Sequence, residues 1–304
     1  MEAIAVKVAG FIVIIALGFV ARAAGLLGRE DARILSNIVM NITLPCALVS
    51  GMNGAAVDAT VLVAFAMGLA ANIVLIATAR LRARREDAAG RACEMLNTGG
   101  YNVGNFAIPF AASFFPASGL PFLCMFDAGN SIMCLGGTYS IVRGSLKSGR
   151  HVSVRDFLRT LLSSVAFDTY MVLLVLAFAG IALPTPVVEV TGMIGGANSF
   201  LVMFMLGVLL DVHIDTTRLH AIARILTTRY GLSIAFAALV LIAAPLPLIG
   251  RHMVAVALCS PLSNINAVYS AELGLDGKVP AAVATLSILV STVLMSIAVV
   301  QFAA

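Results

Sequence analysis

Charged residues are scarce in this chain of 304 residues. Asp, Glu, Lys and Arg make up 11% of it, whereas a soluble domain carries about 25%. Apolar residues make up 61%, and the mean hydropathy is +1.04. This composition excludes a cytosolic enzyme and a disordered chain. The excess of Lys and Arg, 19 against 15, is too small for a nucleic-acid binder, so no nucleic-acid partner is expected.

Familiar catalytic and metal-binding motifs are missing as well. The five cysteines are odd in number, lie in or beside apolar runs and form no CxxC pair, and the four histidines have no ligand-like neighbours. The chain contains no HExxH, no Gly-x-Gly-Asp and no Walker motif. We therefore expect no enzyme, no cofactor, no metal site and no ATP-driven transport.

Long apolar segments fill the chain almost completely. A membrane-spanning helix needs about 20 residues. The sequence therefore predicts an all-α integral membrane protein with ten transmembrane helices. We expect the first segment to remain as a span, although Ala-Arg-Ala at 21–23 resembles a signal cleavage site. The ten segments are 3–23, 31–52, 58–79, 93–117, 119–142, 157–182, 187–210, 219–245, 250–273 and 279–302.

Basic residues indicate how these spans are oriented. With the N-terminus outside, the outer side carries only Lys7 and Arg251, which favours a multi-pass protein with both termini outside by the positive-inside rule. On this interpretation no Lys or Arg lies near the middle of the membrane. The inner side carries Arg22, Arg29, Arg33, Arg80, Arg82, Arg84, Arg85, Arg91, Arg143, Lys147, Arg150, Arg155, Arg159, Arg218, Arg224, Arg229 and Lys278.

The ten spans divide into two halves of five, residues 1–148 and 149–304. Because five is odd, the second half enters the membrane inverted, as in many secondary transporters. The fourth span of each half contains a proline among small and polar residues, at 102–109 and at 260–266. Proline removes a backbone donor, and an interrupted helix in hydrocarbon is tolerated only where it is buried or lines a cavity. The two spans are therefore predicted to be broken helices. Two packed proline kinks remain the alternative.

Broken helices would place helix N-termini, with their positive dipole ends, inside the membrane, where an anion can bind. Ionisable residues within spans are functional candidates as well. Asp127, with Asn130 beside it, and Glu272 are candidates for proton or ion coupling. The alternative for Asp127 is a structural pairing, and for Glu272 a position at the membrane interface. The candidate substrate-binding residues are Asn102, Asn105, Pro109, Ser260, Pro261, Ser263, Asn264 and Asn266.

At these residues the sequence resembles the auxin efflux carrier family, which includes plant PIN proteins and bacterial organic-acid permeases. The similar stretches are Gly18–Leu27 with Leu35–Pro45, Asn102–Pro109 and Pro261–Gly274. The resemblance implies a fold like that of bile-acid/sodium symporters, in which spans 4 and 9 cross. Spans 1, 2, 6 and 7 would form a scaffold domain, and spans 3–5 and 8–10 a transport domain.

The resemblance also implies a function. The substrate would be a small carboxylate, moved by an elevator-type mechanism, and two copies would pair through the scaffold domain. A long central loop typical of the plant proteins is missing, which favours a bacterial inner-membrane protein. The coupling ion would be H⁺ through Asp127, or Na⁺ at the crossing by analogy with the symporters. An anion channel or a non-transporting sensor is the alternative. The anion, the direction and the coupling stay open.

Overall fold

The computed structural model describes residues 2–55, 57–146, 155, 159, 162–210, 218–275 and 277–302. Within these ranges the chain is helical, and its one extended pairing is an isolated bridge between Tyr101 and Leu262. The expected all-α class is confirmed. The predicted boundary between the two halves, at 148 and 149, lies outside the described residues, as do the basic residues Lys147 and Arg150.

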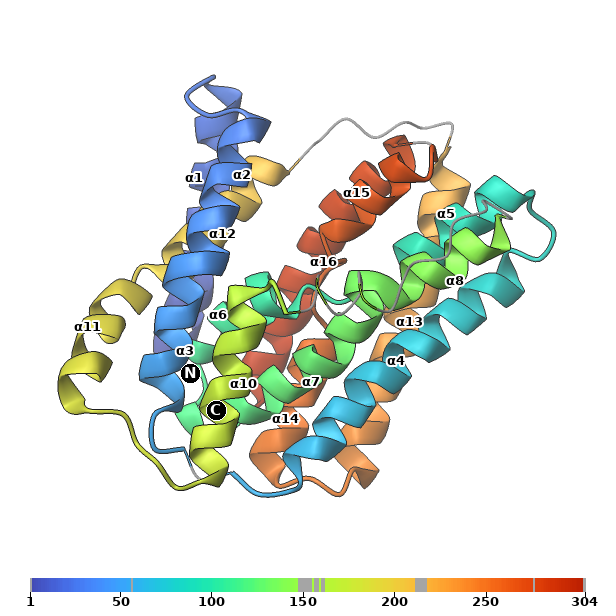
Figure 1. The fold of residues 1–304 in the computed structure, drawn as a ribbon. Helices are drawn as coiled ribbons and strands as arrows, with labels where there is room; N and C mark the ends of the chain where they lie inside the picture. Colours follow the sequence, from blue (N-terminus) through green and yellow to red (C-terminus); the bar gives the residue numbers. More distant parts are fainter. Residues whose placement is uncertain are drawn as a thin grey trace.

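The first half of the chain forms long helices interrupted at a few points (Figure 1). Short π-helical or 3-10 stretches, labelled η, join several of them. The elements are α1 (Glu2–Ala23), α2 (Arg29–Ile38), η1 (Val39–Thr43), α3 (Leu44–Met52), α4 (Val61–Arg82), α5 (Ala88–Thr98), η2 (Val103–Ala107), α6 (Ile108–Ala112), η3 (Ala117–Gly119), α7 (Leu120–Ile132), η4 (Met133–Gly137) and α8 (Thr138–Ser145).

The described part of the second half is built of α-helices. Its long helices pack beside those of the first half, so that the two halves form one bundle in Figure 1. The elements are α10 (Val165–Phe178), α11 (Thr185–Gly195), α12 (Asn198–Leu209), α13 (Leu219–Ala243), α14 (Leu248–Leu258), α15 (Ile265–Glu272) and α16 (Lys278–Phe302).

Six helical stretches in the described part of the chain are long and apolar enough to cross a membrane. They are Val6–Ala23, Glu30–Met52, Val61–Arg82, Thr185–Leu209, Leu219–Ala243 and Lys278–Phe302. Each matches one predicted span. The chain is therefore a multi-pass helical membrane protein. The other four predicted segments contain shorter helices, namely α5 with α6, α7 with α8, α10, and α14 with α15.

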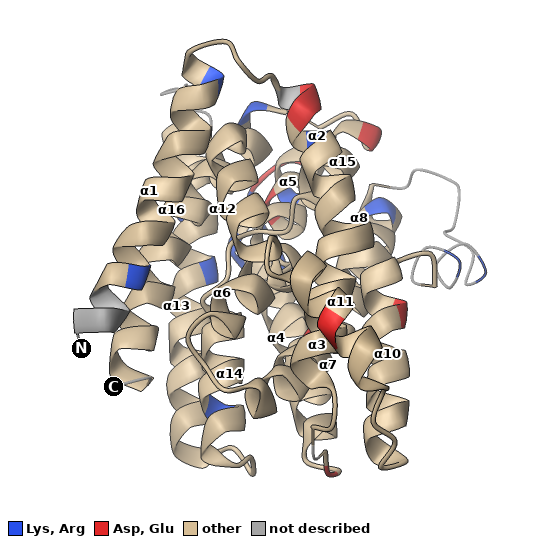
Figure 2. Cartoon of the chain, turned by 90° about the vertical axis from the view of Figure 1, so that its left-hand side faces the viewer, with Lys and Arg blue, Asp and Glu red and all other residues tan. Residues whose placement is uncertain are grey.

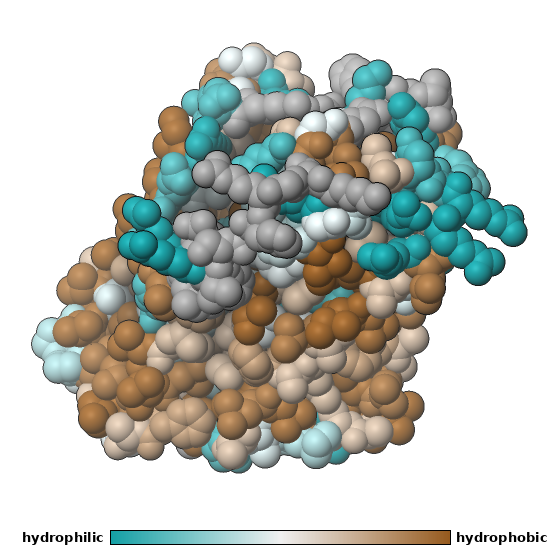
Figure 3. Space-filling model, turned by 45° about the vertical axis from the view of Figure 1, so that its right-hand side comes forward, coloured by the Kyte–Doolittle hydropathy of each residue, from teal (hydrophilic) through white to brown (hydrophobic). Residues whose placement is uncertain are grey.

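The surface agrees with a membrane location. Large apolar side chains are exposed along several helices, including Leu81, Met193 and Ile242. Figure 3 shows hydrophobic side chains over the lower part of the visible face and hydrophilic ones toward its upper end. Charged residues gather toward the same end in Figure 2, where α2, α5, α8 and α15 lie. The turn between α1 and α2 and the turn between α4 and α5 lie there too, and the second of these carries the predicted inner-side residues Arg84 and Arg85.

Two helix pairs approach each other through glycines. On α4 and α7, a Cβ placed on Gly68 would lie 2.1 Å from the carbonyl oxygen of Phe126, and one on Gly129 would lie 2.1 Å from that of Phe65. On α1 and α12, Gly18 and Gly207 make contacts of the same kind. Small residues allow such close backbone contact between membrane helices. These pairs hold α4 with α7 and α1 with α12 as rigid units.

Candidate functional site

Two extended segments cross in the interior of the bundle. The first, residues 99–102, separates α5 from η2, and the second, residues 259–264, separates α14 from α15. We call these two segments together the crossover. The amide of Asn102 donates to the carbonyl of Pro261 at 2.9 Å, and the amide of Ser263 donates to the carbonyl of Gly100 at 3.3 Å. Each break therefore satisfies backbone groups of the other, which unpaired in hydrocarbon would cost several kcal/mol each.

The first break depends on glycine. Gly100 has a φ of +84°, in the left-handed region that residues with a Cβ rarely adopt. A Cβ at Gly100 would also lie 3.1 Å from Cys134 Sγ. Pro109 lies in the first turn of α6, several residues after the break. Pro261 thus lies within the second break, whereas the first break lies at Gly99 and Gly100, before Pro109.

Polar side chains of α4 and α7 support the first segment. Asn72 Oδ1 accepts from the amide of Gly100 at 2.7 Å. Asn130 accepts from the amide of Tyr101 at 3.0 Å and donates to its carbonyl at 2.8 Å. Asn72 Nδ2 also donates to Asn130 Oδ1 at 3.1 Å. The two amides fix the backbone of the first segment where no regular helix holds it.

A side chain of α16 supports the second segment, and one of α15 supports the first. Ser287 Oγ accepts from the amide of Leu262 at 3.1 Å. Asn266 Nδ2 reaches across to the carbonyl of Gly99 at 2.8 Å. Both supporting side chains are buried. Asn266, predicted as a substrate ligand, therefore bonds the backbone of the crossover.

Arg229 on α13 is fully buried at the crossover, with an exposed fraction of 0%. Its Nη1 donates to the carbonyl of Thr98 at 2.9 Å, and its Nη2 to the carbonyls of Ser260 and Pro261 at 3.1 and 3.0 Å. The expectation that no basic residue lies near the middle of the membrane is wrong. Arg229 lies near the middle of α13 because broken backbone supplies carbonyls that a buried guanidinium can bind. The sequence does contain one indication of this location, because Arg229 lies well inside the predicted segment 219–245.

A cavity of about 100 Å³ lies beside the crossover. Its walls come from the crossover and η2, from α7 and η4, and from η1 and α10 across the gap. Among its polar lining residues are five predicted site residues and three others. The predicted ones are Asn102, Asn105, Asp127, Asn130 and Ser263, and the others are Tyr101, Ser131 and Tyr170.

Two of the lining amides keep free polar atoms. Asn102 Nδ2 and Asn105 Oδ1 are buried and have no hydrogen-bond partner among the described residues. Asp127 is 8% exposed, and its Oδ1 accepts from Asn130 Nδ2 at 3.0 Å. Its Oδ2 lies toward Gly104, where a Cβ would approach it to 3.4 Å. Two lining amides thus each keep one buried polar atom unpaired, and a buried carboxyl group belongs to the same lining.

The remaining predicted residues do not line this cavity. Ser260 and Pro261 face Arg229 through their carbonyls, and Asn264 is half-buried at the start of α15. Pro109 lines a second cavity of about 320 Å³ between α3, α6, α11 and α12. Glu272 is exposed at the end of α15. The structure thus brings together the first-segment residues with Asp127, Asn130 and Ser263.

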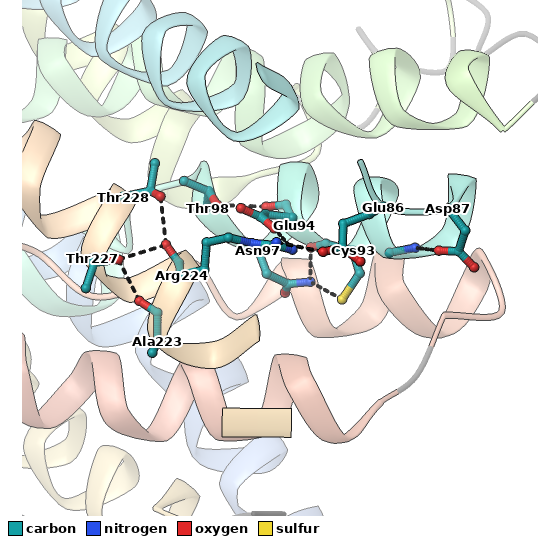
Figure 4. A network of polar contacts seen from close by, with 11 residues as sticks. Glu86, Asp87, Cys93, Glu94, Asn97, Thr98, Ala223, Arg224, Thr227 and Thr228 are labelled. Carbon is teal, nitrogen blue, oxygen red and sulfur yellow. Dashed lines mark hydrogen bonds and ion pairs between the residues drawn. The ribbon is translucent and has the colours of Figure 1, made fainter. Parts of the chain in front are cut away.

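A separate ion-pair network ties α13 to α5 (Figure 4). Arg224 Nη1 donates to Glu86 Oε1 at 2.6 Å, and Nη2 pairs with Glu94 Oε2. Glu94 is 2% exposed, so its pairing with Arg224 offsets part of the desolvation cost of a buried charge. Arg224 therefore holds two helices together rather than lying free in a loop.

Comparison of the chain with protein-family models and with curated proteins finds no match.

Proposed function

We propose that this protein is a secondary carrier or facilitator that moves a small organic anion, a carboxylate, across the inner membrane of a bacterium. One observation carries the proposal. Two interrupted helices cross in the interior next to a cavity with polar lining residues, and two of these, Asn102 and Asn105, each keep a buried polar atom without a hydrogen-bond partner among the described residues. Transporter binding sites are typically built this way, from discontinuous helices near the middle of the membrane.

The pattern of support at the crossover favours an inverted repeat of five plus five spans. Asn72 lies near the middle of α4, the third predicted span, and bonds the first segment. Arg229 lies near the middle of α13, the eighth, and bonds the second. Asn130 and Ser287 play the same two roles from the fifth and tenth spans. Corresponding helices of the two halves thus support corresponding segments.

The walls of the cavity favour a moving domain. The crossover, α7 and η4 belong to the proposed transport domain, whereas Met40 of η1 and Phe167 of α10 belong to the proposed scaffold. A binding site between two such units opens to one side of the membrane when one unit slides along the other. This geometry supports the elevator mechanism implied by the resemblance to auxin efflux carriers. Pairing of two copies through the scaffold domain is proposed from that resemblance alone.

Counterflow in proteoliposomes tests the proposal. Vesicles loaded with an unlabelled monocarboxylate should accumulate the labelled compound transiently, and a panel of carboxylates identifies the substrate. A channel gives flux that does not saturate and shows no counterflow. A non-transporting sensor gives binding, measured as a thermal shift, without flux. Either result contradicts the carrier proposal.

Asn105→Ala examines the site itself. Loss of an amide that pairs with the substrate should lower exchange by about tenfold or more, since about 1.4 kcal/mol corresponds to tenfold. Asn37→Ala, the same change at an exposed position of α2, should exchange like the wild type. Equal exchange by both variants would remove this cavity as the substrate site. Asn264→Ala should have a smaller effect than Asn105→Ala, because Asn264 does not line the cavity.

A further inference from the structure

The guanidinium of Arg229 occupies a cage of backbone carbonyls. Thr98 comes from the end of α5, and Ser260 and Pro261 come from the second segment of the crossover, so the three oxygens belong to both broken helices. The ring of Tyr101 covers the group, with the guanidinium carbon 4.6 Å from the ring centroid. Backbone carbonyls freed by unwound helices are the ligands with which transporters hold a coupling Na⁺. In this protein those ligands are taken by a side chain.

We propose that Arg229 is a resident cation at the crossover, which replaces a coupling Na⁺ and supplies a fixed positive charge for an organic monoanion in the adjacent cavity. This inference rests on the proposed function. A guanidinium keeps its charge under all conditions in proteins. The ring of Tyr101 contacts the guanidinium, and Tyr101 also lines the cavity. Arg229 is thus a positioning residue that attracts the anion without touching it.

The charge balance of the site follows from this arrangement. Among the described residues that line the cavity, Asp127 is the one with a carboxyl group. With Asp127 protonated, Arg229 leaves one positive charge beside the cavity, which one carboxylate neutralises. A dianion would leave an excess negative charge in a low-dielectric site, where unpaired charge is costly. The proposed substrate is therefore a monocarboxylate, and no Na⁺ is needed to carry it.

Thermal unfolding of the purified protein tests the resident cation without requiring transport. Replacing NaCl by choline chloride at equal ionic strength should leave the wild-type transition unchanged. Arg229→Ala should unfold several degrees lower, and millimolar guanidinium should recover part of the loss by entering the vacated cage. Arg251→Ala is the matched control, because Arg251 also bonds backbone carbonyls, those of Leu246 and Leu241, but away from the crossover. It should not respond to guanidinium.

Counterflow of a monocarboxylate tests the role in transport. Wild-type exchange should be the same in Na⁺ and in choline. Arg229→Ala should exchange the monocarboxylate about tenfold more slowly or slower still, where each factor of ten corresponds to about 1.4 kcal/mol. Added guanidinium should restore part of this exchange. Arg229→Lys, which keeps the charge, should fold and retain Na⁺-independent exchange in part.

Several results would overturn the inference. They are a wild type that needs Na⁺ or is stabilised by it, an Arg229→Ala protein with normal exchange, and an Arg229→Lys protein no better than Arg229→Ala. If the wild type exchanges no carboxylate, the proposed function fails, and the anion-attracting role of Arg229 fails with it. The unfolding measurements then still decide whether guanidinium fills the carbonyl cage.

Discussion

Most polar side chains at the crossover pair with backbone atoms. Asn72, Asn130, Asn266, Ser287 and Arg229 each bond an amide or a carbonyl of the two extended segments. In an apolar interior, backbone groups outside regular helix must find such partners. Asn102 and Asn105 differ, because each keeps a buried polar atom without a partner among the described residues. Ser260 Oγ in the second segment is unpaired in the same way, but Ser260 does not line the cavity, so Asn102 and Asn105 are the candidates to gain hydrogen bonds from a ligand there.

Asp127 is the residue we expect to carry a proton. It is buried in the wall of the cavity and bonded by Asn130. Net proton-coupled transport needs a group that titrates there, whereas exchange needs only the substrate site and the moving domain. Asp127→Asn should therefore abolish pH-driven accumulation of the substrate and retain counterflow, both measured on one purified preparation.

The control for Asp127→Asn is Asp58→Asn, at an exposed turn before α4. There the amide and hydroxyl of Thr60 hold the pKa of the carboxyl below its usual value. This variant should keep both activities. If Asp127→Asn still accumulates substrate after a pH jump, Asp127 does not couple protons. Equal loss of both activities with a lower unfolding temperature would assign it a structural role.

Which residues surround the cavity could be predicted only in part. The sequence indicates polar residues near a proline, and this pattern identifies Asn102, Asn105 and Ser263. The pattern does not indicate which way each side chain faces. After a break, the rotation of the next helix about its axis depends on how the two extended segments of the crossover pair. Asn264 and Glu272 therefore lie outside the cavity lining. Arg229 was missed because an arginine near a basic loop is usually at the membrane surface.

The two broken helices differ in how they are interrupted. The second contains Pro261 within its extended segment, as the loss of a backbone donor predicts. The first breaks at Gly99 and Gly100, and Pro109 begins a new turn where its missing amide is not needed. Proline thus marks the neighbourhood of each break in the sequence, whereas the backbone conformation at Gly100 fixes its position.

The contact between α4 and α7 should be sensitive to a single methyl group. A Cβ on Gly68 would meet the carbonyl oxygen of Phe126 at 2.1 Å, so Gly68→Ala must push the helices apart. We expect a loss of about 1–3 kcal/mol of stability, as for other overpacked sites. Thermal unfolding in detergent measures it.

Gly231→Ala is the matched control for that contact. Gly231 is exposed on α13, and a Cβ there would have no neighbour within 4 Å. Because alanine has the higher helix propensity, this variant should be stabilised by about 0.4–1 kcal/mol. The two identical substitutions should therefore shift the transition in opposite directions. A shift in the same direction would mean that α4 and α7 do not pack as closely as described.

At the scale of the whole molecule, both halves of the chain build one site. The crossover joins residues from the fourth predicted span of each half, and α10 and η1 complete the cavity. Hydropathy and charge predicted the helical membrane class, because lipid selects apolar helices of sufficient length. They could not predict the contact between the halves, which depends on specific pairing of Tyr101 with Leu262.

The proposed movement makes a last prediction, at the boundary between the proposed scaffold domain and the proposed transport domain. Ser113, at the end of α6, and Ser199, on α12, have their Oγ atoms 3.1 Å apart, and both donate to the carbonyl of Pro109. Cysteines at the two positions should form a disulfide on oxidation, since such bonds need Cβ atoms only about 3.8 Å apart. That bond would fasten the transport domain to the scaffold and abolish counterflow.

Substrate binding should survive this cross-link, because the cavity at the crossover is left in place, and a thermal shift with the substrate measures it. Reduction should restore counterflow in the double variant. The single variants Ser113→Cys and Ser199→Cys should exchange equally before and after oxidation, which controls for the native cysteines. Mass spectrometry establishes how completely the bond has formed. Because an elevator cannot run with its two domains joined by a covalent bond, normal counterflow in fully cross-linked protein would exclude this mechanism.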